Sequence, residues 1–412
     1  MIKELKECIA AVKQVISEQG VAVYFQPVIS LESRGIVGFE AFARGVDELG
    51  NTVADASCLF NESLPPQARR RVEQLCLSKS LQSYRSISEK YPTMLLLLNV
   101  NLALFSDDLY EGMDFESLFT PFEYNPRQVV LEFDSEQLQK KVPMELIRKL
   151  QKQGYRISVD NVDAGLACKE RMLRIRPDFA KLDRSLYAGI ENSGYIKRMA
   201  ASAAMVIEQV GAIPVAKGVE SEAESFALAE TGFCLQQGYF FSDKAEEGGN
   251  FADKVARVHF HYRENRLASV NDAQKTFREM HLILKSAISR LQSEDPSMMN
   301  GVLDDLVKRS PELVSAFILS DSGKQVSKTV VGKSGDRVGV RIKPAAVGSD
   351  HSCEEYFMYL NAGLEKCAGY LGATPFCRQD ARYLAGYFYR DNARKGLILV
   401  LQYVDKLLGE NS

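Results

Sequence analysis

The chain has 412 residues, 46% of them hydrophobic, and a formal net charge of −3, which allows two or three domains with ordinary cores. The small net charge gives no electrostatic basis for binding DNA, and the apolar stretch Met94–Val100 is far too short to span a membrane. The eight cysteines include no Cys-x-x-Cys pair, so we expect reduced thiols in a cytoplasmic protein, without a zinc site or disulfides.

Short apolar strands that end in polar residues alternate with amphipathic helices through the first part of the chain. We expect strands at 21–25, 36–39, 94–98, 129–131, 157–159, 179–180 and 213–216, and helices at 1–18, 66–87, 142–153, 195–211 and 221–231. This repeated alternation is typical of the α/β class and predicts a TIM-like (β/α)8 barrel. The active site of such a barrel lies at the carboxyl ends of its strands.

Polar side chains at the predicted strand ends form the candidate site. Glu40, Asn99, Glu132 and Asp160 each follow an apolar strand. Carboxylate and amide oxygens are the ligands that Mg²⁺, Mn²⁺ and Ca²⁺ prefer. A divalent ion held between carboxylates is a common means of hydrolysing a phosphodiester. The residue types and their spacing therefore predict a site for phosphate chemistry.

A polar segment at 243–250 ends the alternating pattern, and a long helical run follows at 251–291. We expect further helices at 298–308 and 353–371 and strands at 316–320, 382–389 and 396–404, the last two antiparallel around a turn at 390–393. The predicted domains are a barrel at 1–245, a helical linker at 246–295 and an α+β domain at 296–412, which resembles PAS or Cache-like sensory domains. A small domain that only dimerises is an equal alternative. Because long helices outside a core often pair with another chain, we expect a homodimer.

Seven ordered motifs carry a resemblance that covers roughly residues 20–243. They are Phe25–Val28, Gly38–Arg44, Leu98–Asn101, Leu131–Phe133, Pro177–Asp183, Val215–Glu220 and Gln237–Ser242. In this order they resemble the EAL-domain phosphodiesterases, which hydrolyse cyclic di-GMP in bacteria. The segment Gly38–Arg44 is similar to the signature Glu-Ala-Leu-x-Arg, with Phe42 in place of Leu.

The resemblance implies a role for each matching residue. It implies metal ligands at Glu40, Asn99 (or, by register, Asn101), Glu132 and Asp160, for Mg²⁺, Mn²⁺ or Ca²⁺. It implies that Lys181 holds the attacking water or the phosphate, and that Glu220 supports the catalytic site. It implies that Gln26, Arg44, Asp183 and Gln237 line the groove for cyclic di-GMP.

Two departures from the family pattern fall at the metal centre. Asn161 stands where the family has a second successive aspartate, and Lys217 stands where it has a glutamate that binds metal. A protonated lysine cannot ligate a metal ion, and its charge repels one at close range. We therefore expect Lys217 to occupy the space of one metal, and catalysis by two metals to be lost.

The predicted function is a cyclic di-GMP receptor or regulatory module that is catalytically inactive or weak. One alternative is an active phosphodiesterase that produces linear di-GMP. The other is an adaptor that binds a protein partner and no nucleotide.

Overall fold

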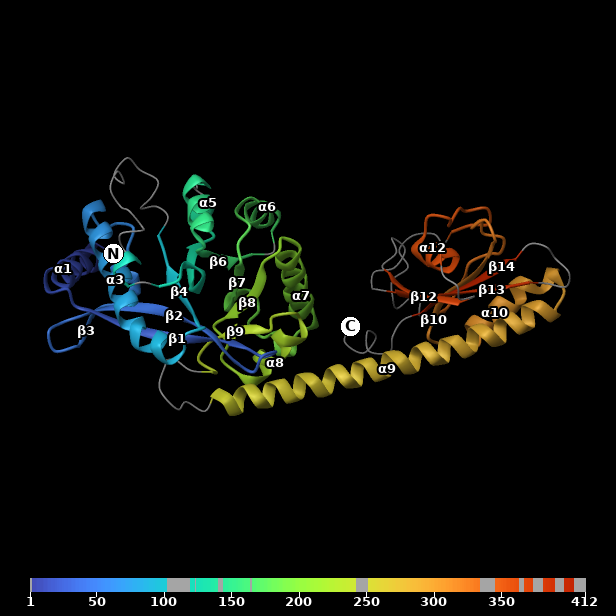
Figure 1. The fold of residues 1–412 in the computed structure, drawn as a ribbon. Helices are drawn as coiled ribbons and strands as arrows, with labels where there is room; N and C mark the ends of the chain where they lie inside the picture. The colour runs from blue at the N-terminus through green and yellow to red at the C-terminus, as the bar shows by residue number, and fades with distance from the viewer. Residues whose placement is uncertain are drawn as a thin grey trace. The chain divides into compact units, whose positions relative to one another are not determined.

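The computed structural model describes residues 2–101, 119–122, 124–139, 144–163, 165–241, 251–333, 345–362, 367–372, 381–389 and 396–403. The chain divides into two compact units, Met1–Arg263 and Glu264–Ser412 (Figure 1). Among the described residues, no helix combines the length and the apolar character needed to cross a membrane.

Eight strands of the first unit close into a barrel, which confirms the predicted fold. They are β1 (Val21–Ser30), β2 (Gly35–Val46), β4 (Leu95–Asn99), β5 (Val129–Asp134), β6 (Arg156–Val162), β7 (Phe179–Asp183), β8 (Ile213–Lys217) and β9 (Leu235–Gln237). The order around the barrel is β1-β9-β8-β7-β6-β5-β4-β2, and pairing of β1 with β2 closes it. The short strand β3 (Thr52–Ala54) pairs with β2 outside this ring.

The first strand runs against its neighbours. β1 pairs antiparallel with both β2 and β9, whereas β2 and β4–β9 are mutually parallel. The sequence predicts that β1 ends before Pro27, but the strand continues to Ser30. Proline is tolerated there because β9 pairs only with Ile29 and Ser30, so that β1 has one neighbour at Pro27 and needs fewer ladder hydrogen bonds.

Helices cover the outside of the barrel (Figure 1). They are α1 (Ile2–Glu18), α2 (Ala56–Leu59), α3 (Pro66–Lys90), α5 (Met144–Gln153), α6 (Leu166–Ile175), α7 (Gly194–Gln209) and α8 (Glu222–Glu230). The sequence of β4 is apolar on both faces because its leucines pack in two different clusters. Leu96 and Leu98 pack in the cluster beneath the helices, while Leu97 packs with Val130 and Phe179 in a separate cluster.

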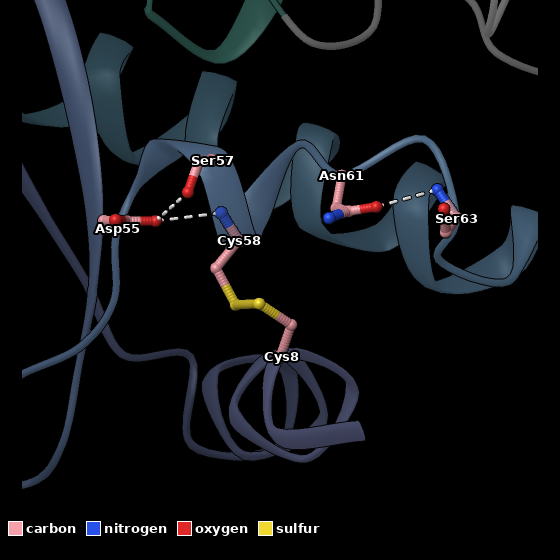
Figure 2. Close-up of a disulfide and its surroundings, with 6 residues drawn as sticks. All are labelled: Cys8, Asp55, Ser57, Cys58, Asn61 and Ser63. Carbon is pink, nitrogen blue, oxygen red and sulfur yellow. Dashed lines mark hydrogen bonds between the residues drawn. A yellow bond between two sulfur atoms is a disulfide. The ribbon is translucent and has the colours of Figure 1, made fainter. Parts of the chain in front are cut away.

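A disulfide joins Cys8 of α1 to Cys58 of α2, with 5.3 Å between their Cα atoms (Figure 2). The side chain of Asp55 caps α2 by accepting a hydrogen bond from the Cys58 backbone N–H (2.9 Å) and another from the Ser57 hydroxyl (2.7 Å). The expectation of reduced thiols is therefore wrong for Cys8 and Cys58. Their 50-residue separation contains no motif from which the pairing could be predicted.

The predicted long helix is present as α9 (Phe251–Ser293). Val255 and Val258 of its first turns pack into the core of the first unit, and Leu284 and Leu291 pack into the core of the second. The second unit also contains α10 (Met299–Arg309), α12 (Glu355–Ala362), β10 (Leu313–Ser320), β11 (Val330–Val331), β12 (Cys367–Gly372), β13 (Ala381–Phe388) and β14 (Leu397–Tyr403). Its antiparallel sheet has the order β11-β10-β14-β13-β12.

The second unit corrects one prediction and confirms another. The helix expected at 353–371 is wrong, because α12 ends at Ala362 and β12 pairs with β13 along its whole length. Sheet pairing overrides the local helical preference here. The antiparallel pairing of β13 with β14 is confirmed, and the turn expected at 390–393 lies outside the described residues. The PAS-like assignment stays a prediction.

Candidate functional site

A cavity of about 510 Å³ opens at the carboxyl ends of the parallel strands. Most of the predicted site residues line it: Gln26, Glu40, Arg44, Asn99, Glu132, Asp160, Asp183 and Gln237. Several of them occupy the last position of their strand, as Asn99 does in β4 and Asp183 in β7. Parallel strands bring such positions to one edge, so residues far apart in the sequence meet there.

Lys181 of β7 joins two acids from other strands. Its Nζ lies 2.7 Å from Glu40 of β2 and 2.7 Å from Glu132 of β5, and all three side chains are buried. Burial opposes the charged form, but the two carboxylates more than offset it and raise the pKa of Lys181. The ammonium group is therefore held permanently charged between the acids.

The two acids differ in their protonation. Burial and the neighbouring Glu40 charge raise the pKa of Glu132 to about 8. Glu40 is equally buried, but the charge of Lys181 holds its pKa below the usual value. Glu40 also accepts hydrogen bonds from the amides of Asn99 (2.7 Å) and Gln237 (2.8 Å). Glu40 is thus the acid that stays ionised near neutral pH, while Glu132 can hold a proton.

A second ammonium group lies in the cavity itself. Lys217, the last residue of β8, places its Nζ 2.8 Å from Asp160 Oδ2 and 3.6 Å from Asp183 Oδ2. Burial opposes ionisation of Asp183, but hydrogen bonds from Ser185 and the charge of Lys217 lower its pKa. The side chain of Lys217 therefore bridges the carboxyl ends of β6 and β7.

Asn161 does not line the cavity. Its backbone is left-handed, with φ of 55°, a conformation that asparagine adopts more readily than most residues. Its side-chain amide donates to Asp134 Oδ2 (2.6 Å), and its backbone carbonyl oxygen accepts a hydrogen bond from the Ser135 hydroxyl (2.6 Å). Asn161 thus links β6 to the end of β5.

Lysine ammonium groups pair with three of the acids that the resemblance implies as metal ligands. Glu40, Glu132 and Asp160 each have a lysine Nζ within 2.8 Å, so each already has a cationic partner. Within the described ranges, no group of three Asp, Glu, His or Cys side chains is arranged to hold a metal ion. When all four acids (these three and Asp183) are ionised, they and the two ammonium groups give this cluster a formal charge of −2.

Sequence reasoning missed Glu73, a buried residue of α3 that also lines the cavity. Its carboxylate accepts a hydrogen bond from the backbone N–H of Asn101 (3.0 Å), and burial raises its pKa to about 7. The strand-end pattern could not reveal an acid in the middle of a helix. The available signal was an acid next to Val72 and close to Cys76 on the helix face that is buried.

Two predicted site residues, Lys181 and Glu220, are not part of the cavity lining. Asn99 and its alternative Asn101 both are. Lys181 is buried beneath the cavity, in contact with Glu40 and Glu132 as described above. Glu220 is about half exposed and pairs with Arg184 (3.0 Å), which also binds the buried Glu224 (2.7 Å). Asn99 is the asparagine whose side chain contacts Glu40.

Comparison with known proteins gives the same assignment over the first unit. The family pattern described as "EAL domain" matches residues 9–244. The cyclic di-GMP phosphodiesterase RocR of Pseudomonas aeruginosa is 24% identical over 222 residues, and the probable cyclic di-GMP phosphodiesterase PdeB of Escherichia coli is 23% identical over 240. These alignments cover 53% and 56% of this chain but only 56% of RocR and 44% of PdeB, about half of each relative's length.

Similar solved structures match the first unit, and one of them spans both units. The crystal structure of the Bacillus subtilis YkuI protein, in complex with cyclic di-GMP and calcium, covers 97% of this chain and 98% of its own, with a TM-score of 0.73 and 15% identity. The FimX EAL domain of Pseudomonas aeruginosa covers 60% of this chain and 99% of its own, with a TM-score of 0.52 and 17% identity. At such identities the likeness concerns the fold. The family match, which spans more than half of the chain, is the deciding observation: this protein belongs to the EAL domain family.

Proposed function

We propose that this chain is a receptor for cyclic di-GMP whose barrel has lost metal-dependent hydrolysis. The family supports the ligand, since RocR and PdeB are named as cyclic di-GMP phosphodiesterases and YkuI is described in complex with cyclic di-GMP. The observation that carries the loss of activity is the pair between Lys217 Nζ and Asp160 Oδ2 at 2.8 Å. It supplies a tethered cation where the family pattern has a carboxylate.

The cavity offers suitable partners for both parts of the ligand. Cyclic di-GMP has two phosphodiesters, each with one negative charge, and Arg44 and Lys217 are the cations that line the cavity. Arginine is well suited to bind phosphate through paired hydrogen bonds. The edge of each guanine base presents N–H groups, and the carboxylate of Glu73 can accept hydrogen bonds from them. Phe60 adds an aromatic surface to the same lining. Gln26 and Gln237, which bond to each other (2.9 Å), complete the groove with Asp183.

Hydrolysis would require a group that deprotonates water and a means of offsetting the charge that develops on phosphorus. Asp160 is engaged by Lys217, and Glu132 by Lys181. If a divalent ion such as Mg²⁺, Mn²⁺ or Ca²⁺ bound, it would have to displace Lys217 from Asp160. The arrangement therefore favours holding an intact phosphodiester over cleaving it.

Two measurements test the proposal. Calorimetry with cyclic di-GMP, in buffer with EDTA and again with Mg²⁺, Mn²⁺ or Ca²⁺, should show binding under every condition. Chromatography for linear di-GMP should show no product after prolonged incubation. Appreciable product from the wild type, absent in Lys181→Ala when circular dichroism shows that variant to be folded, would instead establish an active phosphodiesterase. No heat at high protein concentration would point to an adaptor that binds a protein partner.

A further inference from the structure

The middle of α9 is exposed to solvent. Every residue from Arg263 to Asp272 is exposed to solvent, although the segment includes Leu267 and Val270. A helix that is exposed all round gains no stability from tertiary packing, which is the main source of helix stability in proteins. A continuous row of apolar residues along such a segment indicates a partner that covers it.

Two large apolar residues of this segment, Leu267 and Val270, and two that flank it on α9, Phe260 and Phe277, form what we call the apolar stripe. Their side chains are exposed to 59% at Phe260, 46% at Leu267, 49% at Val270 and 40% at Phe277. They follow one another at intervals of seven, three and seven residues. In a supercoiled helix with 3.5 residues per turn this places all four within an arc of about 50°. The stripe has the a and d positions of a coiled-coil seam.

The stripe is symmetric about its own centre, between Ala268 and Ser269. When two copies run antiparallel about a twofold axis at that point, Phe260 meets Phe277 of the second copy, and Leu267 meets Val270. The two polar seam positions also meet each other, because Arg263 comes opposite Gln274. In a parallel pair, Arg263 would instead face Arg263 across the seam, where like charges repel.

Charges beside the stripe favour the same direction. Glu264 and Arg278 lie on the same flank, at the position that follows d in the heptad. The twofold operation brings Glu264 of each copy toward Arg278 of the other. Helical side chains lean toward the N-terminus of their own helix, so in antiparallel helices these two lean toward each other. The dimer would contain this pair twice.

We propose that the apolar stripe of α9 is an interface with a second copy of this chain, formed by antiparallel pairing of the two α9 helices. The proposal concerns α9 alone and is independent of whether the barrel binds nucleotide. It assigns a surface and a direction to the homodimer that the long helix predicts. The stripe is less than three heptads long, so we expect association in the micromolar range.

Sedimentation velocity on the full chain, from about 2 to 200 µM, tests the interface. The wild type should convert from monomer to dimer across this range, and Leu267→Glu should stay monomeric throughout. Leu282→Glu is the matched control, because Leu282 lies on α9 and is 67% exposed but points away from the stripe. Far-UV circular dichroism should show that both variants are folded. A monomeric wild type, a dimeric Leu267→Glu or a monomeric Leu282→Glu would each overturn the proposal.

Charge reversal tests the direction of pairing. Glu264→Arg should weaken the dimer at least severalfold, since it faces Arg278 of the other copy with a like charge. The double variant Glu264→Arg, Arg278→Glu should restore the wild-type dissociation constant. In a parallel pair these two residues do not meet, so the second substitution would restore nothing. Failure of the rescue would therefore refute the antiparallel arrangement.

Discussion

Lys217→Met is the substitution that separates a tethered cation from a metal centre. It removes the ammonium group and keeps a side chain of similar length. In the structure, Nζ lies 2.8 Å from Asp160 and 3.6 Å from Asp183, so its loss changes the formal charge of the cluster from −2 to −3. One charge-assisted hydrogen bond is worth about 2 kcal/mol, or roughly thirtyfold in Kd. We expect a loss of this size for the dianionic ligand.

Calorimetry with cyclic di-GMP, in EDTA and then in millimolar Ca²⁺, checks this expectation. The wild type should bind equally well in both buffers, because Lys217 already supplies the cation. Lys217→Met should bind about thirtyfold more weakly in EDTA and recover most of its affinity in Ca²⁺, since a divalent ion can replace the missing charge. Lys197→Met, which removes a lysine paired with Glu230 outside the cavity, is the control. Wild-type binding that disappears in EDTA, or a Lys217→Met variant that binds normally in EDTA, would refute the reasoning.

Three further predictions concern stability, measured as the free energy of unfolding in urea. Burial raises the pKa of Glu73 in the folded protein to about 7, above its ordinary value of 4.5, so the folded state holds a proton that the unfolded state releases, and stability falls as the pH rises from 4.5 to 7. Glu73→Gln should therefore stabilise the protein by up to about 3 kcal/mol at pH 8 and by less at pH 5.5; equal gains at both values would contradict this cause. Cys8→Ser opens the 50-residue loop to Cys58 and should cost at most about 4 kcal/mol, and a reductant should lower wild-type stability by the same amount; no change would show that the thiols are not linked. Lys181→Met leaves two buried acids unpaired and should cost about 3–5 kcal/mol, whereas Lys197→Met breaks a partly exposed pair and should cost less than about 1 kcal/mol.

Most of the barrel could be predicted because each strand can be recognised from a short stretch of the sequence. Apolar runs such as Leu95–Leu98, each followed by a polar residue and then an amphipathic helix, indicate parallel strands buried on both faces. The direction of β1 was missed, although only four residues, Leu31–Arg34, separate it from β2. A connection this short permits a hairpin but no parallel crossover, so the signal for an antiparallel strand was present.

The identity of most site residues could be predicted, but the contacts between their side chains could not. Lys181 is 141 residues from Glu40 and 49 from Glu132, and only closure of the barrel brings the three together. Glu73 was missed because a helix residue enters the cavity only through packing between α3 and the strands. The expectation that Lys217 occupies the space of one metal came from comparison with the family pattern, and in the structure Lys217 pairs with Asp160.

Removing Lys181 and removing Lys217 would have different consequences for the protein. Lys181 neutralises acids that are buried on every side, so the folded barrel needs it whether or not the site is catalytic. Lys217 is partly open to the cavity and neutralises acids that a bound cation could neutralise equally well. A dianionic ligand entering a cluster of charge −3 would depend on divalent ions, whereas Lys217 offsets part of that repulsion from within the chain. If the proposed function holds, such a site reports ligand concentration by occupancy, because a phosphodiester that is bound and not cleaved leaves only by dissociation.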